Sequence, residues 1–373
     1  MQQLAQNHKV SLFSFYTNNK QLEHLSEANE IFEHVYIEYH KEKYSILNLL
    51  KGTVLSKPFS TYNYWSTKTL KKLYEITQKN RFDVIQIEHT ALAQYAKYMD
   101  CSFKVLDFHN LEYEKMERYA VFQQNALKKY YAKLTAKKLK NYELRVVREF
   151  DLSLTCSNRE KELLQKANPN SEIIVVPNGT DIIDEMALEK QTKKPIKSIL
   201  FVGALNADKN VDAVLYFFNE ILPLILREQP DILFQIVGGS VPTEIQQLRK
   251  HPNVKVLGFI KDLKAILKPG TISVVPLRYG GGTRLKITEA MAHGIPVVST
   301  TLGCEGLDVL HNKNILIADT SESFAQCCLE LISSSSKRES LIKSGYELVT
   351  KQYDWKTITT TLSEIITKKV QPK

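Results

Sequence analysis

The sequence predicts an α/β protein made of two domains, each built around a parallel β-sheet. The chain has 373 residues, more than one hydrophobic core usually organises, so two domains of about 150 to 200 residues are expected. Apolar residues make up 43% and charged residues 24%, as in soluble globular proteins, which excludes a disordered or fibrous chain. Short apolar runs rich in β-branched residues alternate with longer amphipathic stretches, and this pattern is typical of βα units.

The first domain is predicted to span residues 1–184 and to contain six strands. Residues 1–8 resemble the end of a helix, and Gly52 is the only glycine before Gly179. A doubly wound domain normally opens with a buried strand and a glycine turn, so we expect the first strand to lie upstream of this sequence. The alternative is a domain that begins with a short helix. The expected strands are residues 10–16, 34–39, 83–89, 103–109, 151–157 and 172–177.

A lysine-rich stretch without periodicity, residues 185–197, is the predicted linker to the second domain, residues 198–352. This second half has the cleaner Rossmann-like pattern. A final helical segment, residues 353–373, is apolar on one face and is expected to pack back across the first domain. The strands expected in the second domain are residues 198–203, 232–238, 254–257, 272–276, 296–300 and 315–319.

The net charge of +9 makes anions the expected partners. Basic residues are densest between Lys128 and Arg148, in a segment of helical composition. We interpret them as a solvated helix face, with docking on an anionic membrane as the alternative. Nucleic acid is not an expected partner, because aromatic residues do not alternate with these cations in a recognisable module.

The five cysteines match no zinc or redox spacing, so they are interpreted as reduced core thiols. No stretch approaches the roughly 18 consecutive apolar residues of a membrane span, and the N-terminus lacks a signal pattern. The sequence therefore predicts a cytoplasmic protein, with peripheral attachment to the inner face of the membrane as the alternative location.

The most informative segment runs from Gly280 to Val298 and follows an expected strand directly. The glycines, including Gly281 and Gly282, allow the backbone to approach a ligand closely, and a helix beginning at about Thr283 would direct its free amides to the same place. This order of elements predicts an anion-binding site.

Charged side chains at the start of this helix support a phosphate ligand. Arg284 and Lys286 occupy the first turn, where cations are unfavourable unless an anion is bound. Glu289 follows on the same face and could accept hydrogen bonds from ribose hydroxyls. Gly294 is expected to end the helix. The alternative is an ordinary glycine turn with an exposed Lys286–Glu289 pair.

This segment resembles the donor-binding signature of glycosyltransferase family 4, with Glu289 at the second glutamate of the E-x7-E pattern. Val176-Pro177-Asn178-Gly179-Thr180-Asp181 resembles the end of the family's N-terminal domain, and Leu200-Phe201-Val202-Gly203 followed by Lys209 resembles its phosphate loop. Val256-Leu257-Gly258-Phe259 resembles the segment beside the base, and Asp107-Phe108-His109-Asn110 the segment with a histidine near the donor sugar. The resemblance implies the GT-B fold, in which two Rossmann-like domains face each other across a cleft.

The resemblance also implies a function. The family's members move a sugar from a nucleotide-diphosphate donor to a saccharide or lipid-linked acceptor and retain the anomeric configuration. The catalytic residues would be His109, Lys209 and Arg284. The donor would be bound by Gly203, Gly281, Gly282, Thr283, Arg284, Lys286 and Glu289. The chain has no Asp-x-Asp motif, so neither a metal nor a separate cofactor is expected.

Two positions depart from the family pattern. Gly281 stands where the first glutamate of E-x7-E would be, and Ala204 stands where many relatives carry an arginine. A catalytically impaired nucleotide-sugar-binding subunit of GT-B shape is therefore the alternative function, and a nucleotide-sugar epimerase is a minor one.

Overall fold

The computed structural model describes residues 1–41, 45–184, 188, 194–280, 282 and 284–370. The chain divides into two compact units. Unit 1 comprises Met1–Pro177 and the residues from Ile358 onward, and unit 2 is Asn178–Thr357. The chain thus passes into unit 2 after Pro177, whereas the sequence placed the end of the first domain at residue 184. Most of the predicted linker lies outside the described residues.

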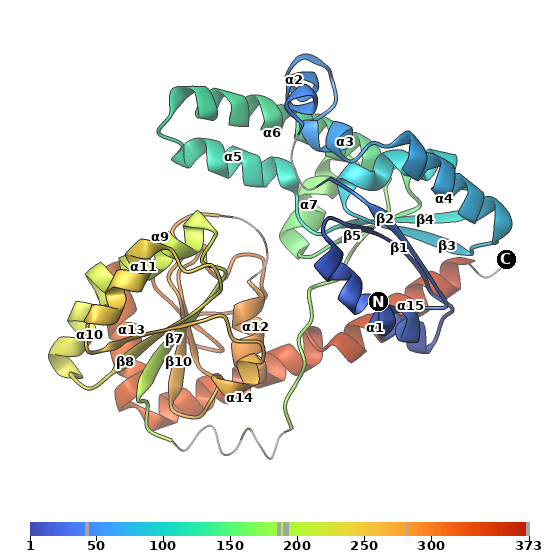
Figure 1. The fold of residues 1–373 in the computed structure, drawn as a ribbon. Helices are drawn as coiled ribbons and strands as arrows, with labels where there is room; N and C mark the ends of the chain where they lie inside the picture. Colours follow the sequence, from blue (N-terminus) through green and yellow to red (C-terminus); the bar gives the residue numbers. More distant parts are fainter. Residues whose placement is uncertain (42–44, 185–187, 189–193, 281, 283, 371–373) are drawn as a thin grey trace. The chain divides into compact units, whose positions relative to one another are not determined.

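Unit 1 contains strands separated by helices, in the order expected for βα units (Figure 1). Its strands are β1 (Ser11–Tyr16), β2 (His34–Tyr39), β3 (Val84–Glu88), β4 (Phe103–Phe108), β5 (Leu152–Thr155) and β6 (Ile173–Val175). Its α-helices are α1 (Leu25–Ile31), α2 (Ile46–Val54), α3 (Phe59–Asn63), α4 (Thr67–Lys79), α5 (Glu112–Phe122), α6 (Ala126–Val146) and α7 (Asn158–Ala167). Short 3-10 helices are η1 (Leu4–Gln6), η2 (Asn19–His24), η3 (Thr90–Tyr98) and η4 (Val147–Glu149).

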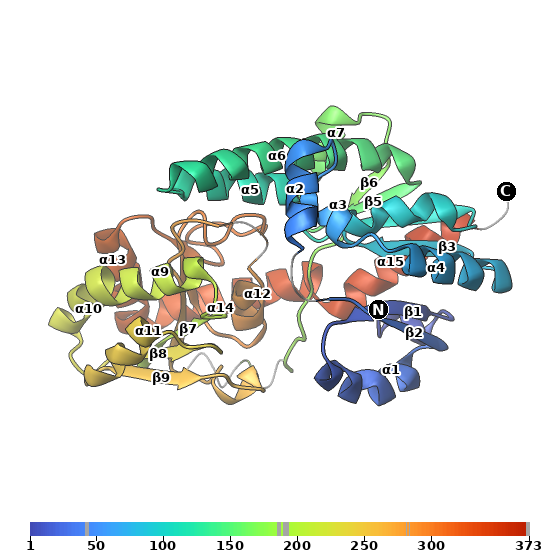
Figure 2. The same cartoon turned by 45° about the horizontal axis from the view of Figure 1, so that its top comes forward.

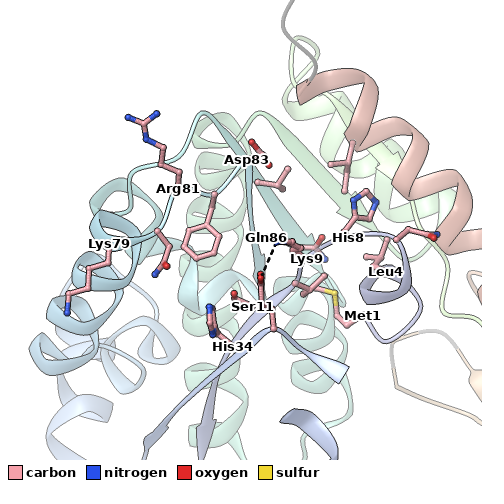
Figure 3. A pocket seen from close by; sticks show the side chains of 17 residues that line it. Met1, Leu4, His8, Lys9, Ser11, His34, Lys79, Arg81, Asp83 and Gln86 are labelled. Atoms are coloured by element: carbon pink, nitrogen blue, oxygen red, sulfur yellow. Dashed lines mark ion pairs between the residues drawn. The ribbon is translucent and has the colours of Figure 1, made fainter. Parts of the chain in front are cut away.

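The strands of unit 1 form two parallel sheets, β1-β2 and β3-β4-β5-β6. A cavity of about 810 Å³ is lined by Ser11 of β1 and by Val84 and Gln86 of β3, together with N-terminal residues such as Met1 and His8 (Figure 3). None of the predicted site residues lines this cavity.

Unit 2 has a more regular alternation of strands and helices. Its strands are β7 (Ser198–Val202), β8 (Leu233–Val237), β9 (Val254–Gly258), β10 (Thr271–Val275), β11 (Val297–Ser299) and β12 (Leu316–Ile317). Its helices are α9 (Asp208–Tyr216), the π-helix η5 (Phe217–Ile221), α10 (Leu222–Glu228), α11 (Thr243–Gln247), η6 (Leu248–Lys250), η7 (Leu263–Ala265), α12 (Leu285–Ala292), α13 (Ser321–Ser333) and α14 (Ser335–Gln352). The last helix, α15 (Trp355–Val370), begins in unit 2 and groups with unit 1 from Ile358.

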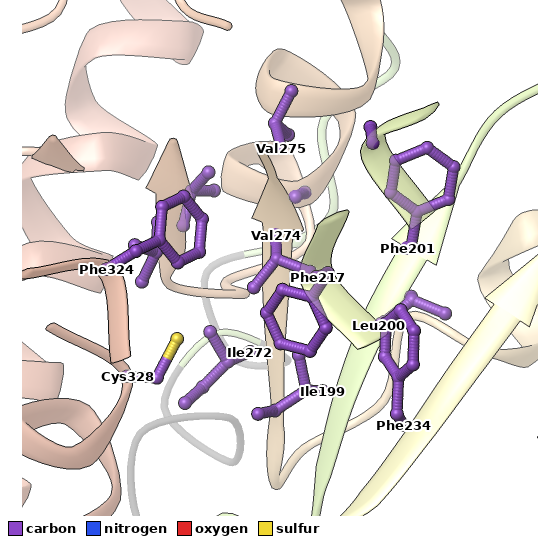
Figure 4. Packing of buried hydrophobic residues seen from close by; sticks show 14 of the residues in the cluster. Ile199, Leu200, Phe201, Phe217, Phe234, Ile272, Val274, Val275, Phe324 and Cys328 are labelled. Carbon is purple, nitrogen blue, oxygen red and sulfur yellow. The ribbon is translucent and has the colours of Figure 1, made fainter. Parts of the chain in front are cut away.

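The strands of unit 2 form one parallel sheet in the order β12-β11-β10-β7-β8-β9. Phe217 and Phe234 pack in its core with ring centroids 4.5 Å apart, beside Ile199 of β7 (Figure 4). Burying such apolar side chains stabilises a fold by about 1.5 to 3 kcal/mol each. The central strands are buried on both faces, which explains why they appear in the sequence as continuous apolar runs.

The segment after Pro177 belongs to unit 2 because its backbone is paired there. The Thr180 N–H donates to the Tyr353 carbonyl at 2.7 Å, and the Tyr346 hydroxyl donates to the Ile183 carbonyl at 2.5 Å. A Cβ on Gly179 would lie 2.6 Å from the Trp355 ring. Because of these contacts, unit 2 begins earlier in the chain than the domain boundary predicted from composition.

All twelve expected strands are present, each within two residues of its predicted ends. The five cysteines are free thiols, but only Cys156, Cys304 and Cys328 are fully buried, while the other two are half-buried. Among the described residues, no helix combines the length and the apolar character needed to cross a bilayer.

Candidate anion-binding site

The residues predicted to bind phosphate follow two adjacent strands of unit 2. β7 and β10 are neighbours in the sheet, although β8 and β9 come between them in sequence. The strand order therefore reverses between β7 and β10, and ligands of open α/β sheets bind at such a point, beside the carboxyl ends of the strands. β7 leads through Gly203 into α9, and β10 leads through the glycine turn into α12.

Gly203 brings the end of β7 close to the other site residues. A Cβ at this position would lie 2.9 Å from Lys286 Nζ and 3.0 Å from Asn210 Cγ. Only glycine leaves this space open without displacing its neighbours. Asn210, which the sequence did not indicate, donates from Nδ2 to the Ala204 carbonyl at 2.9 Å and so fixes the loop between β7 and α9.

Lys209 and Arg284 converge at the glycine turn. A Cβ on Gly280 would lie 2.7 Å from Lys209 Cδ and 3.7 Å from Arg284 Nη2. Gly280 has a φ of 114°, a conformation that residues with side chains rarely adopt. The turn therefore places two cationic side chains beside backbone that only glycine accommodates without strain.

Lys286 is the third cation of this cluster. Its ammonium lies 4.5 Å from the centroid of the Phe201 ring and 3.4 Å from Asn210 Oδ1. Burial, together with the nearby charges of Arg284 and Lys209, lowers its pKa to about 7. Three cations gathered in a partly buried place repel one another, so the arrangement favours an anionic ligand.

The helix that follows the glycine turn begins later than predicted. It starts at Leu285 with Arg284 at the N-cap position, because Arg284 has a φ of −96° and a ψ of 81°, outside the helical region. The prediction that Arg284 lies in the first helical turn is therefore wrong. Its side chain is 5% exposed, and its Nη1 donates to the Gly282 carbonyl at 2.6 Å. Gly281 and Thr283 lie outside the described residues.

Glu289 lies one turn further along α12. It lines a cavity of about 270 Å³ together with residues that include Thr180, Asp262 and His293. Burial raises the pKa of this carboxyl, while His293 and Lys286 lower it. Both Lys286 and Glu289 are partly buried, so the alternative of an exposed surface pair is wrong. Gly294, with a φ of 66°, follows the helix end as predicted.

His109 lies in unit 1, directly after β4. Its Nε2 lies 2.7 Å from Glu88 Oε2, at the end of the neighbouring strand β3. This hydrogen bond raises the pKa of the imidazole, with a further contribution from Asp107. Burial and the charge of Glu88 raise the pKa of Asp107 to about 7. One ligand atom from each of these three residues lies within 4.8 Å of the others, so the group could hold a cation.

The partners of His109 were not predicted from the sequence. Glu88 is the last residue of β3 and His89 follows it, while Asp107 lies near the end of β4 and His109 follows that strand. This repeated pattern of an acid and a histidine at strand ends could have indicated them. His89 has a φ of 102°, and its Nδ1 accepts from the Ala91 N–H at 3.1 Å. A strained backbone of this kind in a residue with a side chain occurs preferentially at functional sites.

The turn after His109 is held by two buried carboxyl groups. Glu143 of α6 accepts hydrogen bonds from the N–H groups of Glu112 and Tyr113, at 3.1 and 3.2 Å. Glu160 Oε1 accepts from the Leu111 N–H at 3.3 Å. The start of α5 is thus capped from outside its own sequence, and the turn after His109 has fixed backbone partners.

Two family models together match almost the whole chain. The model of Glycosyltransferase Family 4 matches residues 1–183, and the model of Glycosyl transferases group 1 matches residues 196–334. An uncharacterised 44.6 kDa protein of the cps region of Klebsiella pneumoniae is 23% identical over 301 residues, which are 78% of this chain and 76% of that protein.

Solved structures show the same fold. The crystal structure of TarM has a TM-score of 0.62 and 16% identity, and the match covers 81% of this chain but 58% of TarM. HepE (Alr3699) of Anabaena, in complex with UDP and glucose, has a TM-score of 0.62 and 15% identity, with 98% of this chain and 94% of that protein covered. The parallel sheets confirm the predicted α/β class with two Rossmann-like domains. Together, these matches show that the chain belongs to the group 1 glycosyltransferases of glycosyltransferase family 4 and has the GT-B fold.

Proposed function

We propose that this protein is a retaining glycosyltransferase that moves a sugar from a nucleotide-diphosphate donor to a precursor of a cell-surface polysaccharide or glycolipid. The observation that carries this proposal is the convergence of Lys209, Arg284 and Lys286 at the ends of β7 and β10. A diphosphate is the anion that best matches three cations beside two helix starts.

The chemical task of these cations is to stabilise the leaving group. When the bond between the anomeric carbon and the diphosphate breaks, negative charge grows on the departing phosphate oxygen. Donors that are already in place stabilise that charge without reorganising during the reaction. Arg284 supplies a planar fork, and Lys209 and Lys286 supply point charges. The first turn of α12 adds backbone amides without a side-chain cap.

The same cluster supports catalysis without a metal. Three cationic side chains supply the positive charge that a divalent ion would otherwise bring to the diphosphate. We therefore expect transfer to continue in the presence of EDTA. A loss of turnover in EDTA that magnesium restores would contradict this part of the proposal.

Glu289 and His109 complete the proposed donor contacts. Glu289 lines a cavity in unit 2, and its carboxyl would accept hydrogen bonds from the ribose hydroxyls. His109, with its pKa raised by Glu88, would contact the transferred sugar. This second assignment rests on the resemblance of residues 107–110 to the family's histidine segment.

The substrate classes follow from chemistry and from the relatives. HepE binds UDP and glucose, so UDP-sugars are the first donors to test. The Klebsiella relative is described as a protein of the cps region, which supports a saccharide or lipid-linked saccharide as the acceptor.

The proposal is tested first by donor binding. Purified protein is screened by thermal shift with UDP-, GDP- and ADP-sugars, because a ligand of the native state raises the unfolding temperature by mass action. The donor that binds is then tested for hydrolysis and for transfer to saccharide acceptors. Arg284→Ala should lose at least about 100-fold in turnover, with an unchanged circular dichroism spectrum. Turnover equal to that of the native protein would remove Arg284 from the mechanism.

A second candidate is a subunit that binds nucleotide sugars without turning them over. Gly281 and Ala204 favour it, because the chain lacks a glutamate and an arginine that many relatives carry. Donor binding without hydrolysis or transfer, over a broad set of acceptors, would support this candidate instead.

A further inference from the structure

A hairpin of two long helices extends from the sheet of unit 1. α5 and α6 lie side by side and meet at the turn around Asn125 (Figures 1 and 2). Their contact is lined by buried residues such as Ala120 and Ala132. The tip is different, because Val121, Leu127 and Tyr130 are 70%, 81% and 71% exposed. Apolar side chains gathered in this way on a surface mark an interaction site.

The charged residues near the tip of this hairpin are all basic. Residues 118–142 contain seven lysines and arginines and neither aspartate nor glutamate. Lys128, Lys133 and Lys137 are exposed, on the same helix as Leu127 and Tyr130. The cations that were predicted to form a solvated helix face are therefore interspersed with exposed apolar side chains.

A second apolar surface is attached to the hairpin. On α2, Leu47, Leu50 and Val54 are 60%, 59% and 80% exposed, and their spacing places them on one side of the helix. No acidic residue occurs between Ser45 and Tyr74. The Lys138 ammonium of α6 donates to the carbonyls of Gly52, Thr53 and Leu55 at 2.6 to 2.7 Å. α2 is thus held on α6 while its leucines remain exposed.

We propose that the hairpin tip and the exposed side of α2 dock on an anionic lipid membrane. Lysines beside the exposed side chains would meet the negative headgroups, and leucine, valine and tyrosine would enter the boundary between headgroups and acyl chains. Aliphatic side chains gain little on a nucleic acid, whose binding sites use stacking aromatics along a basic groove. This inference depends on unit 1 alone and holds whether or not the donor site is catalytic.

The experiment uses the full chain and co-sedimentation with vesicles. One set of vesicles contains phosphatidylcholine alone, and the other contains equal parts of phosphatidylcholine and phosphatidylglycerol. The tip variant carries Leu127→Gln, Lys128→Gln and Lys133→Gln. The α2 variant carries Leu47→Gln and Leu50→Gln. A matched control carries Leu310→Gln, Lys343→Gln and Lys351→Gln, which are also exposed but lie in unit 2.

The native protein should sediment with the anionic vesicles, and raising the salt concentration should weaken this binding. The tip variant should lose roughly 100-fold in partition coefficient, since two lysines and one leucine are removed. The α2 variant should lose about tenfold through its apolar groups alone. The control should bind as the native protein does, and all variants should keep the native circular dichroism spectrum.

Three results would overturn the proposal. The first is absence of native binding to anionic vesicles. The second is a tip variant that binds them as well as the control does. The third is a single-stranded oligonucleotide that displaces the protein from the vesicles at equal phosphate concentration, which would indicate a nucleic-acid partner instead.

Discussion

The ammonium of Lys286 lies 4.5 Å from the centroid of the Phe201 ring, and that ring is fully buried in the core of unit 2. A charged side chain therefore borders the hydrophobic core at the place where Arg284 and Lys209 add charge of the same sign. In the absence of an anion, the cluster should lower the stability of the fold, and a bound diphosphate should restore it.

Replacing Lys286 by methionine should stabilise the protein and weaken donor binding. Burial holds the pKa of Lys286 at about 7 in the folded state, below its usual value of 10.5. The folded state therefore binds fewer protons than the unfolded state between these values, so the stability of the native protein rises with pH across that window. Lys286→Met removes this dependence, and its unfolding temperature should exceed that of the native protein more at about pH 6 than at about pH 9. Calorimetry at both pH values measures the difference, with the exposed Lys255→Met as the control.

Binding of a nucleoside diphosphate should be coupled to proton uptake. The phosphates would raise the pKa of Lys286 from about 7, because an opposite charge favours the ammonium. Above about pH 7 the free protein holds part of its Lys286 neutral and must take up a proton on binding, so the affinity for UDP should fall as the pH rises further. Calorimetric titrations in two buffers of different ionisation enthalpy should give different observed enthalpies. Equal enthalpies in both buffers at about pH 8 would show that Lys286 does not change its charge.

The glycine turn can be tested by adding one methyl group. In Gly280→Ala, the new Cβ would lie 2.7 Å from Lys209 Cδ, and the flexible lysine side chain would have to leave its present position. We expect roughly a tenfold loss of UDP affinity, as for the loss of one charged contact. Gly270→Ala is the matched control, because its φ is also positive, at 86°, and its Cβ would lie 2.7 Å from the Pro195 carbonyl. Gly270 precedes β10, at the amino end of the strand. Both variants should lose stability, and equal losses of affinity in the two would contradict the role of Lys209.

The strands could be predicted because the signals that specify them are local, and the proposal of three cations beside strand ends used equally local signals. Apolar β-branched runs indicated all twelve strands, and Lys209, Arg284 and Lys286 follow strand ends at short range. The start of α12 was placed two residues too early, because composition does not reveal that the backbone of Arg284 is non-helical, with a ψ of 81°.

The partners that connect different strands and helices could not be predicted in this way. Glu88 meets His109 only because β3 and β4 are neighbours in the sheet. Glu143 reaches the start of α5 from the far half of α6. Asn178–Asp184 joins unit 2 through hydrogen bonds to residues more than 100 positions away, such as Tyr353. Each of these depends on the packing of elements that are distant in sequence.

Removing the carboxylate of Glu88 should lower the pKa of His109. The hydrogen bond that His109 makes to the Glu88 carboxylate is the largest cause of the raised pKa, and Asp107 and Glu112 contribute charge alone. Glu88→Gln should therefore shift the titration of the His109 ring, followed by NMR, to lower pH. Glu112→Gln is the control, because it removes a nearby charge without removing that hydrogen bond, and it should give a smaller shift. A larger shift in the control would show that this hydrogen bond is not the main cause of the raised pKa of His109.

Glu143 should make the stability of unit 1 depend on pH. Its buried carboxyl caps the start of α5, and burial raises its pKa to about 8 against an ordinary value of 4.5. Since the folded pKa is the higher one, the contribution of this group to stability is fully present in acid and is lost as the pH rises through about 8. The side chain of Glu143→Gln carries no charge at any pH. The free energy of unfolding of this variant, relative to that of the native protein, should therefore increase between about pH 5 and about pH 8.5, as measured by urea unfolding.

Glu143→Ala should cost about 1 to 3 kcal/mol near pH 5, because the backbone N–H groups of Glu112 and Tyr113 lose their acceptor. The exposed Glu347→Gln is the control. If the stability of Glu143→Gln relative to the native protein does not change with pH, the pKa of Glu143 is not raised. The carboxylate that caps α5 would then be ionised over the whole pH range of the experiment.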